Sequence, residues 1–286
     1  MSALPTVSFV SANFVARELG YRMIGGWQQG DRATQEWFRP VETFAARFEA
    51  MLLEVKALGF EAMDLWGAHL HYSWATPQQI ADAKRLLAQA GLAVPSYAGW
   101  VPGGAGELRK ACALCRVLGI PVIGGYIELV HTERAAAVRV LREFGVAYGY
   151  ENHTGHTPEA VLAKIGDGDG DVIGVALDTG WCGTNGMDTM AAVRVLGPRL
   201  KSVHLKDVLP RRREKTGLES VDAGHETCRL GTGIVPVEAV VRALVAQGYA
   251  GAIGIEHEPE LSDPRPDCRA GLCDVQAWMA AAVPTG

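Results

Sequence analysis

Four polar residues stand at the ends of four successive apolar runs in the second half of the chain. They are Glu151 in GYENH, Asp178 in ALDTG, His204 in VHLKD and Glu256 in IEHE. A charge at the carboxyl end of a buried parallel strand is not needed for packing there. Three converging carboxylates repel one another unless a cation compensates them, and an imidazole beside them completes a mixed ligand set for a divalent ion. Mn²⁺ is the expected ion, with Mg²⁺, Co²⁺ and Zn²⁺ as alternatives.

Each of these residues also has a plain structural explanation when it is taken alone. Asp178 could cap a helix, His204 could be a hydrogen-bonded core histidine, and Glu151 and Glu256 could be charges at the rim. Their occurrence at the ends of adjacent strands is what favours the hypothesis of a metal site.

The runs that carry these residues belong to a longer alternation of strand-like and helix-like segments. We predict strands over residues 7–14, 60–66, 93–99, 121–126, 146–152, 172–178, 201–207 and 252–258. Amphipathic helices, many with Pro near the start and Gly at the end, are predicted over residues 40–59, 76–91, 106–119, 132–145, 157–167, 188–197, 236–248 and 274–283. This strict alternation, without any linker-like composition, predicts an α/β fold, a (β/α)8 TIM barrel that forms a single domain over residues 1–286.

Two long insertions directly follow predicted strands and so belong to the face of the barrel where active sites form. Residues 15–39 include Tyr21, Trp27, Trp37 and Phe38. Residues 208–235 include His225 and the basic residues Arg211, Arg212, Arg213 and Lys215. Each insertion either covers the substrate or forms a mobile surface or an oligomer contact. The basic run could bind a phosphate or carboxylate, or it could simply be solvated.

The composition excludes several classes of protein. The 286 residues carry a formal net charge of -5, which argues against a nucleic-acid partner held by a basic face. No apolar stretch approaches the roughly 20 residues of a membrane span. The N-terminus lacks the pattern of a secretory signal, and six cysteines are scattered along the chain, so we expect a cytoplasmic protein and not a disulfide scaffold. Assembly into a homo-oligomer stays open.

The ordered motifs resemble those of a known enzyme family. The segments ENH, LDTGW, VHLKD and the closing GTGIVP to GYAGAIGIEHEP are similar to the sugar phosphate isomerase/epimerase family, the xylose isomerase-like TIM barrels, as is GFEAMDLWGAHL at the second strand. The resemblance implies that Glu151, Asp178, His204 and Glu256 are metal ligands and that Glu151 and Glu256 are also the catalytic acid and base. It implies a divalent-metal-dependent isomerase or epimerase of a sugar or sugar phosphate, with proton transfer through a metal-stabilised enediolate.

One motif departs from that family pattern. Several members have a histidine three residues after the aspartate of the sixth strand, where this chain has Trp181. An indole there could stack on a sugar face, or it could be ordinary packing beneath a lid.

Further substrate-binding residues are predicted from their positions near these motifs. His153 and His257 could orient a carboxylate or bind substrate, and Lys206 shares the strand face of His204. Trp66 and His69 after the second strand are predicted wall residues. Glu61 and Asp64 are interpreted as internal polar contacts. The complete predicted substrate-binding set is Trp66, His69, His153, Trp181, Lys206, Arg211 and His257.

Three other functions stay open on the sequence alone. An inosose-type dehydratase, a lyase, would use the same metal site but expel a hydroxyl. A metal-dependent endonuclease on this barrel would need more strand-end histidines and a basic surface, which the charge of -5 disfavours. A non-catalytic sugar-binding barrel would keep the aromatic residues. In each enzymatic case except the endonuclease, the expected partner is a small sugar or polyol, with no nucleic acid and no membrane.

Overall fold

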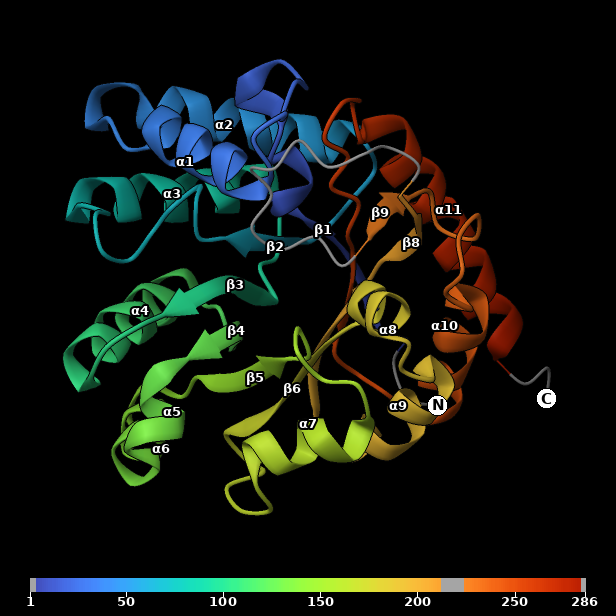
Figure 1. The fold of residues 1–286 in the computed structure, drawn as a ribbon. Helices are drawn as coiled ribbons and strands as arrows, with labels where there is room; N and C mark the ends of the chain where they lie inside the picture. The colour runs from blue at the N-terminus through green and yellow to red at the C-terminus, as the bar shows by residue number, and fades with distance from the viewer. Residues whose placement is uncertain (1–3, 212–223, 284–286) are drawn as a thin grey trace.

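Eight parallel strands close into a barrel in the computed structural model, which describes residues 4–211 and 224–283 (Figure 1). The order around the barrel is β1-β10-β7-β6-β5-β4-β3-β2. The strands are β1 (Thr6–Val10), β2 (Met63–Trp66), β3 (Ser96–Val101), β4 (Val122–Ile127), β5 (Ala147–Glu151), β6 (Ile173–Asp178), β7 (Leu200–Leu205) and β10 (Ala252–Ile255). Each corresponds to one predicted strand, so the prediction of a single-domain TIM barrel is confirmed.

Helices surround the barrel on its outer side (Figure 1). The predicted helices are present as α2 (Val41–Ala57), α3 (Pro77–Ala90), α4 (Ala105–Leu118), α6 (Arg134–Phe144), α7 (Pro158–Ile165), α9 (Thr189–Leu196), α10 (Val237–Ala246) and α11 (Arg265–Ala282). Shorter elements are α5 (Glu128–Thr132), α8 (Thr179–Asn185) and the 3-10 turns η1 (Ser11–Phe14), η2 (Arg17–Leu19) and η3 (Gly197–Arg199). Across residues 4–211 and 224–283, none of the helices combines the length and apolar character needed to cross a membrane.

The two largest differences between predicted and observed boundaries concern one helix and one strand. Helix α11 begins at Arg265 and not at residue 274, and residues 11–14 of the first predicted strand form η1. Both differences lie at the ends of elements, where hydrophobic periodicity gives the least information.

The first insertion contains a helix that the sequence pattern did not predict. Helix α1 (Trp27–Phe38) buries Gly30, Thr34 and Phe38, which lie four residues apart on one face. A Cβ on Gly30 would come within 2.4 Å of the carbonyl oxygen of Val15, so the helix packs too closely for any larger residue there. Because Gly30 and Thr34 are not large apolar residues, this face lacks the apolar periodicity by which helices are recognised.

The second insertion contains a hairpin. Strand β8 (Asp207–Pro210) follows β7 almost directly and pairs antiparallel with β9 (His225–Cys228). Arg212, Arg213 and Lys215 of the predicted basic run lie outside the described residues.

Asp207 fixes the end of this insertion to the barrel. Its buried carboxylate accepts hydrogen bonds of 2.8 to 3.0 Å from the amides of Val208, Gly231, Gly233 and Val235. Gly231 has a φ of +80°, and a Cβ on Gly233 would lie 2.2 Å from Oδ1 of Asp207. The GTG motif therefore needs both glycines, because its amides wrap around a buried carboxylate that would otherwise be costly to desolvate.

We expect Asp207→Asn to destabilise the protein, because an amide offers one acceptor oxygen to four donors. Losing two hydrogen bonds to a charged acceptor, at about 1.5 to 3 kcal/mol each, would lower the free energy of unfolding by about 3 kcal/mol or more. Thermal denaturation should then show a melting temperature that is lower by roughly 6 °C or more. Asp188→Asn is the matched control, because Asp188 caps α9 through the amide of Ala191 and asparagine caps equally well. Equal melting temperatures for the two variants would contradict the role given to Asp207.

Candidate active site

A cavity of about 830 Å³ lies at the carboxyl ends of the barrel strands. The four predicted metal ligands, Glu151, Asp178, His204 and Glu256, all line it. Five of the predicted substrate-binding residues line it as well, namely Trp66, His153, Trp181, Lys206 and Arg211. The fold therefore brings together most of the residues that the motifs singled out.

Asp178 ends β6 and uses its two carboxylate oxygens differently. Oδ1 caps α8 by accepting hydrogen bonds from the amides of Gly180 (2.7 Å) and Trp181 (3.3 Å). Oδ2 is buried without a hydrogen bond among the described residues and lies 3.9 Å from Nζ of Lys206. Helix capping and ligand binding are thus compatible for this residue, because each uses a different oxygen.

His204 on β7 lies between two carboxylates. Its Nδ1 is 3.0 Å from Oε2 of Glu256, and its Nε2 is 3.3 Å from Oδ2 of Asp64 on β2. Asp64 is fully buried and accepts a 2.9 Å hydrogen bond from Oγ of Ser8, which confirms its interpretation as an internal polar contact. Burial alone would lower the pKa of His204, but Glu256 and Asp64 bring it well above its usual value. Asp64 therefore holds the ring from behind, with Nδ1 directed to the carboxylate that lines the cavity.

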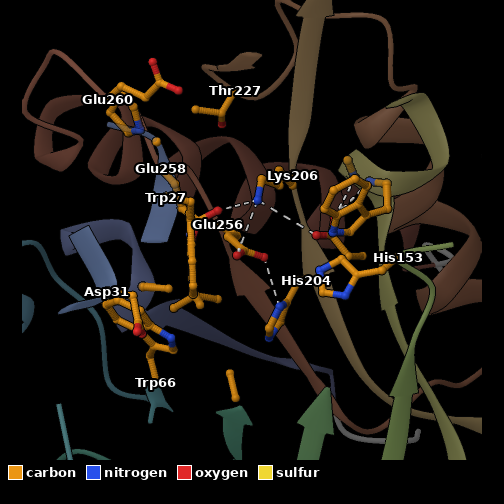
Figure 2. Close-up of a pocket in the computed structure, with 18 of the residues that line it drawn as sticks. Trp27, Asp31, Trp66, His153, His204, Lys206, Thr227, Glu256, Glu258 and Glu260 are labelled. Atoms are coloured by element: carbon orange, nitrogen blue, oxygen red, sulfur yellow. Dashed lines mark hydrogen bonds and ion pairs between the residues drawn. The ribbon is translucent and has the colours of Figure 1, made fainter. Parts of the chain in front are cut away.

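Lys206 lies among carboxylates at the centre of the site (Figure 2). Its Nζ is 2.5 Å from Oε2 of Glu258, 3.5 Å from Oε1 of Glu256 and 3.9 Å from Oδ2 of Asp178. Oε1 of Glu258 accepts a 3.0 Å hydrogen bond from Nε1 of Trp27 on α1. The insertion helix is thereby linked to the charged centre through one carboxylate.

The pKa values of the carboxyl groups are shifted in different directions. Burial, followed by repulsion from Glu256, raises the pKa of Glu151 to about 7. Burial also raises the pKa of Asp178 to about 7, against the attraction of Lys206. Although burial opposes it, attraction by Lys206 and His204 holds the pKa of Glu256 well below its usual value. Without a further cation, Glu151 and Asp178 would be partly protonated near neutral pH while Glu256 is ionised.

His153 and Trp181 form the wall beside Glu151. Nε2 of His153 is 3.4 Å from Oε1 of Glu151, and the imidazole stands edge-on to the indole with 4.6 Å between ring centroids. Burial lowers the pKa of His153, so the ring favours its neutral form. A neutral imidazole in this position can exchange a proton with the carboxyl group.

Two buried asparagines hold the backbone on either side of the charged centre, and the sequence pattern did not identify them. Asn152 accepts a 2.8 Å hydrogen bond from the amide of Asp178 and donates to its carbonyl oxygen at 3.0 Å. Asn13 accepts a 2.6 Å hydrogen bond from the amide of His257 and donates to the carbonyl oxygen of Ile255 at 3.0 Å. Each side chain bridges to a segment that carries a predicted ligand. The available signal was an asparagine in the last two positions of a predicted strand.

Glu258 was also missed, whereas His257 was wrongly predicted to bind substrate. Nδ1 of His257 lies 3.0 Å from Oγ1 of Thr227, and Nε2 lies 3.2 Å from Oδ2 of Asp267, so the ring is directed away from the cavity. Extended backbone turns alternate side chains to opposite sides. Glu256 and Glu258 therefore share the side that faces the cavity, and His257 takes the other.

The predictions for His69 and Glu61 were wrong as well. The ring of His69 is fully buried and packs edge-on against Phe38 and Trp66, so it does not line the cavity. The amide of His69 bonds to the carbonyl oxygen of Trp66 in a turn, which ends the alternation of the strand. Glu61 is exposed and pairs with Lys56 at 2.9 Å.

Arg211 lines the cavity, but its guanidinium already has a carboxylate partner there. It donates two hydrogen bonds, of 3.0 and 3.1 Å, to Glu260. A substrate phosphate or carboxylate would have to compete with this bidentate pair.

The predicted metal ligands have suitable chemistry but do not yet form a ligand shell. Among residues 4–211 and 224–283, no three histidine, cysteine or acidic side chains form a group that could hold a metal ion as they lie. Oδ2 of Asp178 is nevertheless buried without a hydrogen bond among the described residues, whereas Oε2 of Glu256 faces Nδ1 of His204 at 3.0 Å. Asp64 behind His204 is the kind of carboxylate that accompanies metal-bound histidines. The donor set therefore fits a divalent cation, provided that Lys206 moves away from Asp178 and Glu256 and that Nδ1 of His204, now 3.0 Å from Glu256, loses its proton.

The chain is similar to known proteins in sequence pattern and in fold. Residues 52–272 match the family model described as xylose isomerase-like TIM barrel. A xylose isomerase-like TIM barrel protein from Mycobacterium smegmatis, solved in complex with magnesium, is 17% identical, with a TM-score of 0.66 and 98% of each chain covered. The probable 3-DHS dehydratase AsbF from Bacillus anthracis is 12% identical, with a TM-score of 0.63 over 95% of this chain and 98% of that one. The apo form of the 3-keto-D-glucoside 4-epimerase YcjR from E. coli is 14% identical, with a TM-score of 0.60 over 80% of this chain and 94% of that one.

At these identities the solved structures support the fold alone. No curated protein matches the sequence.

We expect Mn²⁺ to raise the melting temperature of chelator-treated protein, more at about pH 8 than at about pH 5.5. Glu151 and Asp178, with pKa values raised to about 7, hold protons at the lower pH that a cation must displace. At a hundredfold excess over Kd the gain is about 2.7 kcal/mol, or roughly 5 to 10 °C in thermal denaturation. Without metal, we expect the pH to act on stability in the opposite direction. The folded state keeps protons on Glu151 and Asp178 that the unfolded chain loses, so the free energy of unfolding falls as the pH rises towards 7.

Asp178→Asn should lose most of the Mn²⁺ effect, and Asp188→Asn should keep it. An absent shift at both pH values, or an equal shift in Asp178→Asn, would rule out the predicted metal site.

Proposed function

The chain belongs to the xylose isomerase-like TIM barrel family, and from that premise we propose that it is a divalent-metal-dependent isomerase or epimerase of a sugar. Glu151 and Glu256 would transfer the proton at a carbon beside a carbonyl group. Two structural neighbours, the 3-keto-D-glucoside 4-epimerase YcjR and the Mycobacterium smegmatis protein in complex with magnesium, support this reaction class and this kind of ion.

The placement of the two glutamates on either side of Asp178 and His204 carries the proposal. Glu151 ends β5 and Glu256 follows β10, and β6 and β7 lie between these strands in the ring. Asp178 and His204, which end the intervening strands, are direct neighbours in the strand register. A flat enediolate lying over that pair would have one glutamate on each face, so that one removes a proton and the other returns one.

The two glutamates also differ in protonation, as an acid and a base must. Glu256 is ionised and suits the role of base, whereas Glu151, with a pKa of about 7, can hold a proton to deliver. His153, 3.4 Å from Glu151, would restore that proton after each turnover. In the reverse direction the roles of the glutamates exchange.

The charge balance of the site supports a bound cation. Five carboxylates, those of Asp64, Glu151, Asp178, Glu256 and Glu258, are opposed by two cationic groups, Lys206 and His204. Glu151, Asp178, His204 and Glu256 are the residues that would hold a divalent ion. When bound, the ion would supply electrostatic stabilisation for negative charge on the carbonyl oxygen of the substrate.

We expect Glu151→Gln and Glu256→Gln each to lower the epimerisation rate at least about a hundredfold on a panel of keto sugars. In deuterated solvent, NMR should show that Glu151→Gln still exchanges the substrate proton, because Glu256 can remove and return it on its own face. Glu256→Gln should lose exchange from that face. Glu238→Gln, which changes an exposed glutamate paired with Arg242, serves as the control and should behave as the unaltered protein.

If both variants kept the rate of inversion and the rate of proton exchange of the unaltered protein, the acid and base assignment would be refuted. Dehydration is the alternative reaction to be tested, because one structural neighbour is a probable dehydratase. Ultraviolet absorbance of a conjugated dione, formed from an inosose, would assign the site to dehydration instead of epimerisation.

A further inference from the structure

The cavity has two chemically different halves. The charged residues of the site come from β5, β6, β7 and the segment after β10. Strands β1, β2 and β3 contribute Val10, Trp66, Ala98 and Trp100 instead. In the closed ring of eight strands, β3 lies opposite β7 and β2 lies opposite β6. A molecule that spans the cavity therefore meets charge at one end and aromatic surface at the other.

Helix α1 lines the aromatic half with residues spaced four apart. Trp27, Asp31 and Gln35 all line the cavity and share one face of the helix. The ring of Trp27 lies 5.2 Å from that of Trp66, and Nε2 of Gln35 donates a 2.9 Å hydrogen bond to Asp31. Figure 2 shows Trp27, Asp31 and Trp66 together on one side of the cavity and His153 on the other.

These residue types are suited to a sugar ring. An indole offers an apolar face for the C–H groups of the ring, and carboxylate and amide groups bond to its hydroxyls. Trp100 is 62% exposed and Trp27 is 38% exposed, although both line a concave wall. Exposed aromatic surface in a concavity is typical of a binding site and costs free energy when nothing covers it.

The size of the cavity exceeds that of a single sugar. A hexose has about 12 non-hydrogen atoms and, at roughly 30 Å³ for each, the liquid volume of a water, would occupy at most about 360 Å³. That is less than half of the 830 Å³ present. Two linked rings, with about 23 non-hydrogen atoms, would occupy at most about 690 Å³ by the same measure and so fit within it.

The charges in the outer part of the cavity disfavour a phosphate group. Asp31, Glu226 and Glu260 line it, and Arg211 bonds to Glu260 through both terminal nitrogens. A phosphate dianion that approached these three carboxylates would be repelled by them. A neutral group would not.

We propose that the substrate is a neutral glycoside with two sugar rings. The reacting ring meets Glu151 and Glu256, and the second ring lies against Trp27, Trp66 and Trp100 with its hydroxyls near Asp31. The assignment of the reacting ring rests on the proposed function. The site for the second ring rests on different residues and can be tested without turnover.

The test is binding, followed by calorimetry or by tryptophan fluorescence, for glucose, glucose 6-phosphate and a panel of glucosyl disaccharides that differ in linkage. We expect at least one disaccharide to bind tenfold or more tightly than glucose, and glucose 6-phosphate to bind no more tightly than glucose. Trp100→Ala and Asp31→Ala should remove that advantage while glucose binding stays unchanged. Trp37→Ala is the matched control, because Trp37 is a 42% exposed tryptophan on α1 that stacks on Arg47 and does not line the cavity.

Three results would overturn the proposal: equal or undetectable binding of all disaccharides, tighter binding of glucose 6-phosphate, or an equal loss in Trp37→Ala. None of these depends on Glu151 or Glu256. Failure of the second-ring site can therefore be told apart from failure of the proton-transfer assignment, which the deuterium experiment reports.

Discussion

The contact between the Lys206 ammonium and three buried carboxylates is the interaction on which the rest of the site depends. Asp178, Glu256 and Glu258 all lie within 3.9 Å of this one nitrogen. A buried carboxylate without a partner is costly, so removing the amine would leave these groups protonated or would drive them apart. His204 adds positive charge on the other side of Glu256, but the total stays negative. The site is therefore built with a deficit of positive charge, which is the condition that favours capture of a cation.

Buried polar side chains behind the charged centre hold these mutually repelling groups in place. Asn152 and Asn13 fix the strand ends that carry Asp178 and Glu256, and Asp64 fixes the ring of His204. None of the three needs to touch a substrate. The repulsion among these like charges is thus opposed by the neutral hydrogen bonds of the two asparagines and by the charged pair of Asp64 and His204, all of which are buried and therefore do not compete with water. Trp27 extends the network to α1 through Glu258, so the covering helix and the charged centre are positioned by the same contact.

The strands and the polar residues that end them were predictable, because parallel strands read as short apolar runs and a charge that follows such a run is conspicuous. What could not be predicted lies just beyond the strand ends. β2 ends at Trp66, and the turn that follows decides on which side His69 lies. β10 ends at Ile255, but the side chains beyond it keep alternating, so Glu258 lies on the side of Glu256 and His257 on the other. Helix α1 was not predicted, because Gly30 and Thr34 on its buried face do not contribute to an apolar periodicity.

The two halves of the cavity have different tasks in this proposal: one half carries out the reaction and the other selects the second ring of the substrate. The groups that would move protons stand on strand ends held by the barrel hydrogen bonds, so their geometry is rigid. The aromatic wall combines Trp66 and Trp100 from strands with Trp27 from an insertion that other barrels of this fold are free to shape differently. Changes in that insertion can alter which second group is accepted without moving Glu151 or Glu256. One limit remains, because Trp27 bonds to Glu258 and Glu258 holds Lys206. A change at Trp27 would therefore be felt in the charge balance at the reacting end, and selectivity and chemistry are coupled through that contact.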